Sequence, residues 1–258
     1  AMARQGYLAG PDADRVEDLN RAFRDSRVDG VWCLRGGYGT MRILDAIDYD
    51  ALRAHPKAII GYSDITALHL AVAARCDLCS FHGPTARAIL TDFSRASLAR
   101  AAGATGGEPC GVAPHARVLR DGVARGPIVG GNLALLTALV GTPYAARCDG
   151  AILIVEDVNE PAYRIDRMLR HLRLAGILAK CSGLLFGDFT LRADSDDDPS
   201  LLDDVLREAA DTVNGPCLAG VPVGHIDDQW TLPLGSIATL DTRARSLHTR
   251  AQLLTSAI

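Results

Sequence analysis

Residues 58–74 read AIIGYSDITALHLAVAA, and this stretch determines the fold class. Its first part, 58–60, is a short apolar run typical of a buried strand, whereas residues 65–74 have the length and composition of a helix. Gly61 begins the turn between them. A buried strand that turns directly into a helix indicates an α/β fold built on a parallel sheet.

The same alternation of strand and helix extends around this stretch. Apolar spacing predicts a helix over 12–26 and a strand over 31–34, followed by a glycine-rich turn and a helix near 40–47. A third strand is expected near 78–81. We therefore predict a Rossmann-like N-terminal domain over residues 1–102.

A second unit is expected after a change of composition. Residues 103–127 are rich in Gly and Pro and predict a linker. Residues 128–258 then predict a smaller, mixed α/β C-terminal domain with strands over 151–155 and 183–187. The acidic run 194–198 lacks the glycine and the distal glutamate of a calcium loop, so we interpret it as a solvated helix N-terminus.

Composition excludes several classes of function. The 258 residues carry a net charge of −4, from 27 basic and 31 acidic side chains, which gives no electrostatic basis for binding nucleic acid or an anionic membrane surface. No apolar run approaches the roughly 18 residues that span a bilayer. The start, AMARQGYLAG, has no apolar signal core. We therefore expect a cytoplasmic protein.

The seven cysteines are odd in number and scattered, which is not the pattern of a secreted disulfide framework. The one C-x-x-C motif, Cys76 to Cys79, lacks the second cysteine pair or spaced histidines that would complete a zinc site. We interpret these cysteines as small buried side chains. The sequence predicts neither a metal nor a cofactor.

Gly61-Tyr62-Ser63-Asp64 lies at the strand-to-helix turn. Such a turn can present a serine hydroxyl at the carboxyl edge of a sheet and direct the amide of Asp64 to the same place. A serine nucleophile also needs a base to take its proton. The motif is not G-x-S-x-G, because Ile65 follows. From local sequence alone, the simpler alternative is that Ser63 and Asp64 cap the helix.

Arg35-Gly36-Gly37-Tyr38-Gly39 is a second strand-to-helix turn. Its three glycines allow backbone amides to approach a ligand closely, as in an oxyanion hole or a phosphate cradle. The segment lacks the Lys-Ser/Thr of a P-loop, so nucleotide binding is disfavoured. A tight turn without a ligand is the alternative.

The candidate acid and base lie in the second half of the chain. Glu156 and Asp157 directly follow an apolar strand, which places carboxylates at a position common in α/β active sites. Asp157 and Glu160 compete for the role, and Asp157 is also expected to cap a helix. His225, in a glycine-flanked loop, is a candidate base near neutral pH, although a lone histidine is more often structural. No other histidine has metal-ligand spacing, and we single out only His82.

Taken together, seven segments resemble the serine LD-carboxypeptidase family, which also includes microcin C immunity peptidases. In chain order, from about residue 6 to residue 240, they are GYLAG, RGGYG, IIGYSDITALH, FHGP, GGNL, ILIVEDVNEPAYRIDRML and GHIDDQWTLPLG. Each is weak alone, but seven in the family's order are specific and outweigh the local alternatives.

The resemblance implies a role for each matching residue. Ser63 would be the nucleophile, Glu156 would orient the histidine, and His225 would act as general base and then general acid. The backbone amides of Gly37 and Asp64 would form the oxyanion hole. The resemblance also implies a two-domain fold, a homodimer, and a small peptide substrate with no cofactor.

Three further residues are expected to contact substrate. Arg35 could pair with a substrate carboxylate, although a structural ion pair is an equal alternative. Gly36 belongs to the same turn. Trp230 stands where an aliphatic residue is common in the family, and it is the aromatic candidate for stacking on a base.

Two departures from the family pattern stand out. Family chains begin with another strand and helix before the GYLAG segment, and here that first strand is absent, which would expose a sheet edge. A truncated start or a different dimer contact would account for it. In addition, HGPTARAI replaces the usual HGPML-like stretch, which could change the substrate pocket.

The leading hypothesis is therefore a serine peptidase that cuts the bond between a diamino acid and the terminal D-alanine of murein tetrapeptides, in peptidoglycan recycling. The first alternative is an immunity peptidase that cleaves a microcin C-type peptide-nucleotide amide. The alternative from another class is a truncated, non-catalytic binding paralogue.

Overall fold

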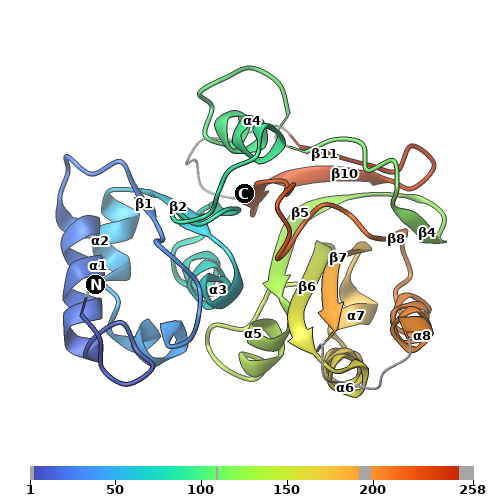
Figure 1. Ribbon diagram of the computed structural model, residues 1–258, viewed down its shortest axis with the longest axis horizontal. Coiled ribbons are helices and arrows are strands. Elements are labelled where there is room, and N and C mark those ends of the chain that lie inside the picture. Colours follow the sequence, from blue (N-terminus) through green and yellow to red (C-terminus); the bar gives the residue numbers. More distant parts are fainter. Residues whose placement is uncertain (1–2, 109, 192–198, 250–258) are drawn as a thin grey trace.

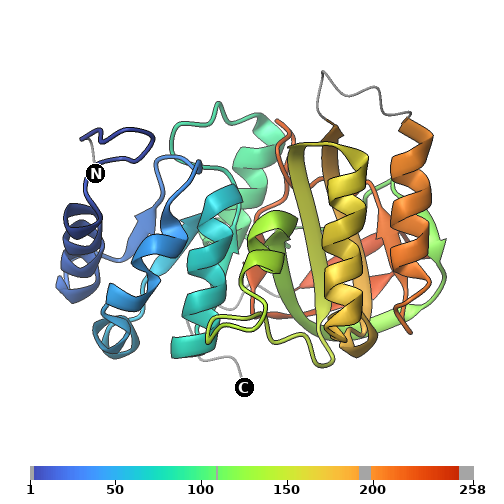
Figure 2. The same cartoon turned by 90° about the horizontal axis from the view of Figure 1, so that it is seen from below.

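A computed structural model describes residues 3–108, 110–191 and 199–249, and the predicted acidic run 194–198 lies outside this part of the chain. The described residues form two α/β units side by side, each with its own sheet (Figures 1 and 2). The predicted fold class is confirmed. None of the helices in these ranges combines the length and apolar character that would let it cross a membrane.

The first sheet has the strand order β1-β2-β3-β9. Its three predicted strands are parallel, and they are β1 (Gly30–Trp32), β2 (Ala58–Gly61) and β3 (Ser80–His82). The fourth, β9 (Leu232–Leu234), comes from the far end of the chain and pairs antiparallel with β3. The N-terminal unit therefore includes a strand from outside residues 1–102.

The helical elements of the first unit include the predicted helices near 12–26, 40–47 and 65–74, whereas the helices over 49–54 and 92–101 were not predicted. In chain order, the elements are α1 (Asp12–Arg24), η1 (Thr40–Ala46), α2 (Tyr49–Ala54), η2 (Ser63–Ile65), α3 (Thr66–Cys76) and α4 (Asp92–Ala101). Among these, α3 is apolar on every side and almost fully buried, because it packs against α2 and η1 on one side and against the second unit on the other.

The second sheet has the strand order β11-β10-β5-β6-β7-β8-β4, in which β5 to β8 are parallel and the flanking pairs antiparallel. The strands are β4 (Arg117–Arg120), β5 (Val123–Asn132), β6 (Ile152–Glu160), β7 (Gly183–Leu191), β8 (Cys217–Ala219), β10 (Ile237–Asp241) and β11 (Ser246–Thr249). The helices of this unit are α5 (Leu133–Ala138), α6 (Ala162–Leu174), α7 (Ile177–Lys180) and α8 (Pro199–Ala210).

Two boundary predictions differ from this structure. The C-terminal unit, expected to be the smaller, carries the larger sheet. The predicted linker 103–127 contains β4 and the first half of β5, which pair with β8 and β10 respectively. The glycines of this stretch were misleading because at least one of them is required by packing within a strand. At Gly126 in β5, a Cβ would lie 2.0 Å from the carbonyl oxygen of Gly150.

The two units meet at the carboxyl ends of their parallel strands. Besides the β3–β9 pairing, the amide of Asn132 at the end of β5 donates a hydrogen bond to Oγ1 of Thr66 at the start of α3, over 2.9 Å. Gly131 allows this contact, since a Cβ there would lie 2.6 Å from the same oxygen. The ends of β2, β3 and β5 and the middle of β6 therefore surround one place.

The expected exposed edge is present on β1, which has no strand on its outer side among the described residues. A groove of about 340 Å³ runs beside it, and Trp32 and Leu34 are each 42% exposed there. Arg35 and Gly36 also line this groove, so it reaches the turn that the sequence connects with catalysis.

Candidate active site

Ser63 lies at the end of β2 in a strained backbone conformation. Its φ of 65° is in the left-handed region, which a residue with a side chain seldom adopts. The strain turns the chain sharply between β2 and η2 and is typical of a serine held out at a sheet edge. No side-chain cap is formed at the start of η2 or α3, so the helix-capping alternative for Ser63 and Asp64 is wrong.

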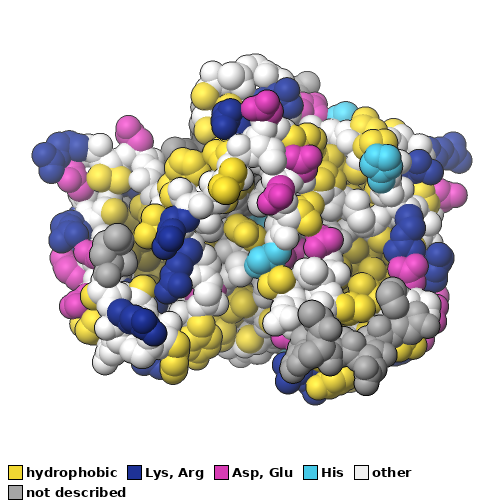
Figure 3. All heavy atoms as spheres, in the orientation of Figure 1, with side chains coloured by type: hydrophobic (Ala, Val, Ile, Leu, Met, Phe, Trp, Pro, Cys, Tyr) yellow, Lys and Arg dark blue, Asp and Glu magenta, His cyan; other side chains and the backbone are white. Residues whose placement is uncertain are grey.

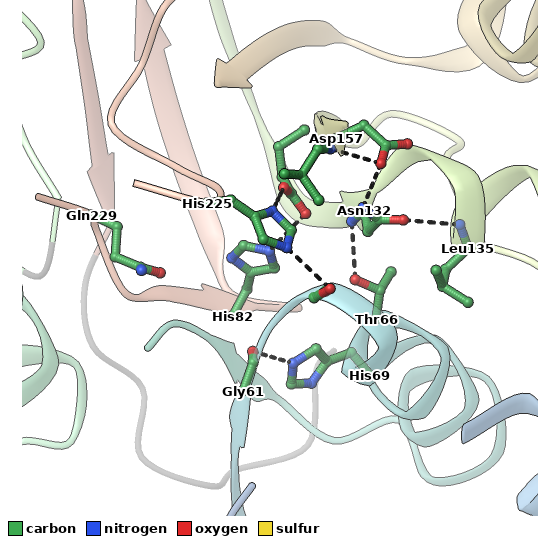
Figure 4. A network of polar contacts seen from close by, with 12 residues as sticks. Gly61, Thr66, His69, His82, Asn132, Leu135, Asp157, His225 and Gln229 are labelled. Atoms are coloured by element: carbon green, nitrogen blue, oxygen red, sulfur yellow. Dashed lines mark hydrogen bonds and ion pairs between the residues drawn. The ribbon is translucent and has the colours of Figure 1, made fainter. Parts of the chain in front are cut away.

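The structure brings Ser63, His225 and Glu156 together across the two units. Oγ of Ser63 lies 3.1 Å from Nε2 of His225, and Nδ1 of that ring lies 2.8 Å from Oε2 of Glu156. The carboxylate can only accept, so Nδ1 carries a proton and Nε2 is left to accept the hydrogen bond from the serine hydroxyl. Figure 4 shows His225 reaching down from the loop after β8 toward this contact.

Glu156 is 0% exposed and lies within β6, paired with Asn132 at the end of β5. Burial alone would raise the pKa of its carboxyl group, but the hydrogen bond from His225 and the charges of His82 and His225 outweigh burial and hold that pKa below its usual value. Two glycines make room for the carboxylate. A Cβ at Gly187 or at Gly224 would lie 3.1 Å from Cβ of Glu156.

The two competing acids have other partners. Asp157 accepts hydrogen bonds from Nδ2 of Asn132 and from the amide of Ala134 in the first turn of α5, at 3.0 and 2.9 Å. Asp157 does not cap the helix that follows it, because α6 begins without a side-chain cap. Instead it accepts one amide of α5, whose N-cap residue is Asn132. Burial raises the pKa of its carboxyl group to about 6. Glu160 pairs with Arg164 at 3.3 Å.

The glycine-rich turn packs directly against the serine. A Cβ at Gly36 would lie 2.8 Å from Cβ of Ser63 and 3.1 Å from its Oγ. Gly37 has a φ of +115°, which favours glycine. Asp64 fixes the end of the turn, because its Oδ2 accepts hydrogen bonds from the amide and the hydroxyl of Thr40, at 2.9 and 2.6 Å.

This close approach gives a first prediction. Gly36→Ala should lower kcat/KM at least about tenfold, because the added methyl group displaces either the serine or the turn by a few tenths of an ångström. Steady-state kinetics on the folded variant is the measurement. The matched control is Gly106→Ala, where a Cβ would meet nothing within 4 Å. Equal activities for both variants would show that the turn does not confine the nucleophile.

The three predicted substrate contacts have different surroundings. Arg35 is exposed, and no ion pair or hydrogen bond joins its side chain to any other described residue, so the structural ion-pair alternative finds no partner there. Gly36 lies beside Ser63, as described above. Trp230 is only 3% exposed and lies in the hydrophobic core of the second unit. This burial contradicts the expectation that its ring contacts substrate.

A pocket of about 270 Å³ opens beside His225, and most of its lining was not predicted. Tyr62, Ile89 and Gln229 line it. The ring of Tyr62 lies 4.8 Å from that of His225. Only Tyr62 carried a signal in the sequence, as the neighbour of Ser63. Asp227 also lines this pocket. In the view of Figure 3, acidic side chains lie close to a histidine near the centre of the molecule.

Metal ligands do not gather in the described part of the chain, where no group of three or more His, Cys, Asp or Glu side chains is placed to hold an ion. The thiols of the C-x-x-C motif are free and contact different elements. Cys76 hydrogen-bonds to the carbonyl of Tyr49, and Cys79 contacts Ser236.

A serine hydroxyl, an imidazole and a buried carboxylate in this sequence of contacts define the class of serine hydrolases. Comparisons with known proteins identify the family. Residues 1–83 match the model of the LD-carboxypeptidase N-terminal domain, and residues 125–240 match that of the LD-carboxypeptidase C-terminal domain. The chain belongs to the LD-carboxypeptidase family.

Three relatives illustrate the range of the family. A probable murein peptide carboxypeptidase of Bacillus subtilis is 37% identical, over 94% of this chain and 78% of its own. The crystal structure of muramoyltetrapeptide carboxypeptidase from Oxalobacter formigenes is 30% identical, with a TM-score of 0.83 over 95% and 85% of the two chains. The microcin C7 self-immunity protein is 25% identical, with a TM-score of 0.84 over 98% and 84%.

Proposed function

We propose that the protein is a serine LD-carboxypeptidase that hydrolyses the amide bond to the terminal D-alanine of murein tetrapeptides, in peptidoglycan recycling. The observation that carries the proposal is the continuous chain of contacts from Ser63 through His225 to Glu156. The relatives named for murein peptides give the substrate class.

The reaction follows from the contacts. Nε2 of His225 removes the proton of Ser63 while Oγ attacks the scissile carbonyl, and Glu156 stabilises the imidazolium that forms. The amides of Gly37 and Asp64 are the proposed donors to the oxyanion, each contributing about 3 kcal/mol. The imidazolium then protonates the leaving D-alanine amine. Water, deprotonated by the same imidazole, releases the acyl group.

Arg35 is the proposed partner of a substrate carboxylate. It is exposed beside Gly36 and lines the groove that reaches the turn. A carboxylate on an unpaired guanidinium makes a charge-assisted, bidentate contact that is present in both ground and transition states.

Arg35→Gln should therefore raise KM about tenfold and leave kcat nearly unchanged, because it removes binding that does not change during the reaction. Arg35→Lys should recover part of the loss. The control is Arg243→Gln, which alters an exposed arginine in the turn between β10 and β11. A fall in kcat without a change in KM would place Arg35 in the chemical step instead.

The alternative substrate is a microcin C-type peptide-nucleotide amide, favoured by the structural similarity to the microcin C7 self-immunity protein. The burial of Trp230 counts against it, since that ring was the candidate for stacking on a base. Parallel digests of a murein tetrapeptide and a microcin-like amide, followed by mass spectrometry, separate the two. Release of D-alanine with an intact amide supports the first, and the reverse result supports the second.

The remaining alternative is a non-catalytic binding paralogue. A binding protein has no chemical need for a buried carboxylate, an imidazole and a serine hydroxyl in hydrogen-bond contact, so the geometry argues against it. Hydrolysis of neither substrate in the parallel digests would favour it.

The same proposal includes a cytoplasmic homodimer that acts on small peptides. Seven unpaired cysteines, most of them buried, suit a reducing compartment. Two exposed apolar side chains, Ile89 in the lining of the 270 Å³ pocket and Phe93 in α4, offer a surface for a second copy. Sedimentation velocity at micromolar concentration distinguishes the dimer from a monomer.

A further inference from the structure

A second imidazole faces the buried carboxylate from the opposite side. His82, the last residue of β3, is 1% exposed, and its Nε2 lies 3.8 Å from Oε1 of Glu156. This distance is about 0.6 Å beyond the usual range of an N–H···O hydrogen bond. Figure 4 shows His82 close to His225, with His69 further down on α3.

The atoms on both sides of this gap are without partners. Neither nitrogen of His82 nor Oε1 of Glu156 forms a hydrogen bond with any described residue. Oε2 of the same carboxylate, in contrast, is bonded to His225. A buried polar atom left unpaired is destabilising, so a small movement that joins Nε2 to Oε1 is favourable.

Two rings pack against His82. The ring of Tyr62 packs edge-on against it, with centroids 6.0 Å apart, and the ring of His69 lies at 6.5 Å. The Nε2 atom of His69 is engaged with the carbonyl of Gly61 at 2.9 Å. On the side of β5, a Cβ at Gly131 would lie only 3.2 Å from Cδ2 of His82. The backbone there confines the imidazole against Glu156.

We propose that Nε2–H of His82 donates a hydrogen bond to Oε1 of Glu156 as the site closes on substrate, so that the carboxylate is held between two imidazoles. His82 is then a positioning residue, which acts through Glu156 on the orientation of His225. This inference rests on the proposed function, because it assigns a role within that triad. Hydrogen bonds of this kind are often long in the free enzyme and shorten in the complex.

Loss of the His82 donor should change the pH dependence of the rate in one direction. Both histidines help to hold the pKa of the Glu156 carboxyl below its usual value against the effect of burial. The other titratable groups that face this carboxylate are Asp157, Asp188 and Tyr62. Loss of the second donor leaves a more basic carboxylate, so a proton on the Glu156–His225 pair is held more strongly. The acidic limb of the rate profile should therefore move to higher pH.

The experiment compares two nearly isosteric variants, assayed for D-alanine release from a murein tetrapeptide. His82→Met removes the donor and should lower kcat about tenfold, with KM unchanged, and move the acidic limb upward by about half a pH unit. His82→Gln keeps an N–H at the position of Nε2, so its kcat and the pH of its acidic limb should both be close to those of the wild-type protein. The control is His69→Gln, which alters a neighbouring buried imidazole and should leave the limb in place. Identical profiles for the Met and Gln variants would overturn the proposal.

A second measurement uses the wild-type protein, so it does not depend on whether a variant folds. Imidazole ¹⁵N spectra of the wild-type protein, assigned by through-bond correlation, should show a proton on Nε2 of His82. A proton on Nδ1 alone would overturn the proposal. The spectrum is recorded without substrate, so it also separates this inference from the proposed function. A wild-type protein that carries the Nε2 proton but releases no D-alanine would refute the substrate and still support His82 as the donor toward Glu156.

Discussion

Ser63→Ala is expected to lower D-alanine release from a murein tetrapeptide by about 10⁴-fold or more, while the fold is retained. Its Oγ is the atom that contacts Nε2 of His225, at 3.1 Å, and a methyl group can neither attack a carbonyl nor donate a proton to the imidazole. The remaining rate would come from substrate binding and the oxyanion donors alone.

The stability of this variant should change little. Alanine adopts the φ of 65° at a cost similar to that of serine, and no cap is lost because Ser63 forms none. Thermal unfolding by circular dichroism checks this, and Ser26→Ala, in an exposed turn after α1, is the control for activity. A folded Ser63→Ala protein with full turnover would exclude Ser63 as the nucleophile.

Glu156→Gln is expected to lower kcat about 10³- to 10⁴-fold with little change in KM. The amide is neutral, so it cannot stabilise the imidazolium, and its NH₂ group can turn toward Nδ1 and favour the wrong tautomer of His225. The carboxylate does not reach the 270 Å³ pocket, which is why substrate binding should persist.

The same substitution should also change the pH dependence of stability. The carboxyl pKa is 4.5 in the unfolded reference and is lowered in the folded protein, so its ionisation stabilises the fold above about pH 4.5. That contribution is lost as the pH falls toward the folded pKa, and the Gln variant lacks it. Thermal unfolding at a series of pH values gives the comparison.

Asp157→Asn is the control for Glu156→Gln, because it removes the charge of the neighbouring carboxylate. Asp157 accepts the amide of Ala134 at the start of α5, so its loss should cost stability more than turnover. If Asp157→Asn abolished turnover and Glu156→Gln did not, the acidic role would belong to Asp157.

Local sequence predicted the parts of the fold that local chemistry decides. The alternation of apolar runs with helical spacing located β1, β2 and β3 and the helical segments α1, η1 and α3 to within a few residues, but it missed α2. The pairing of β9 with β3 was not predictable, because three residues that include Pro233 have no strand signal of their own. This pairing depends on how the two units pack.

Glycine was the main source of error between the units. In residues 103–127 the glycine content suggested a linker, yet Gly126 lies within β5. This position requires glycine because the carbonyl of Gly150 leaves no room for a side chain. The same reason applies to Gly130, where a Cβ would lie 1.9 Å from the carbonyl oxygen of Ile154. Composition alone does not distinguish a glycine required by packing from one required by a turn.

In the site, family resemblance predicted more than the local sequence. Ser63 and His225 are 162 positions apart, and nothing in either segment indicates the other. Burial is not readable from a motif, and for this reason Trp230 was misassigned to the substrate surface. The approach of His82 to Glu156 likewise depends on how the two units pack, because β3 belongs to the first sheet and β6 to the second.

The most direct test of the central claim is to treat the wild-type protein with a fluorophosphonate and map the modified peptide by mass spectrometry. An alcohol activated by His225 displaces fluoride and forms a phosphorus–oxygen bond, so the adduct should be found on Ser63 and should form far more slowly in His225→Ala. An active protein that gains no adduct, or that is modified elsewhere and keeps its activity, would contradict the account.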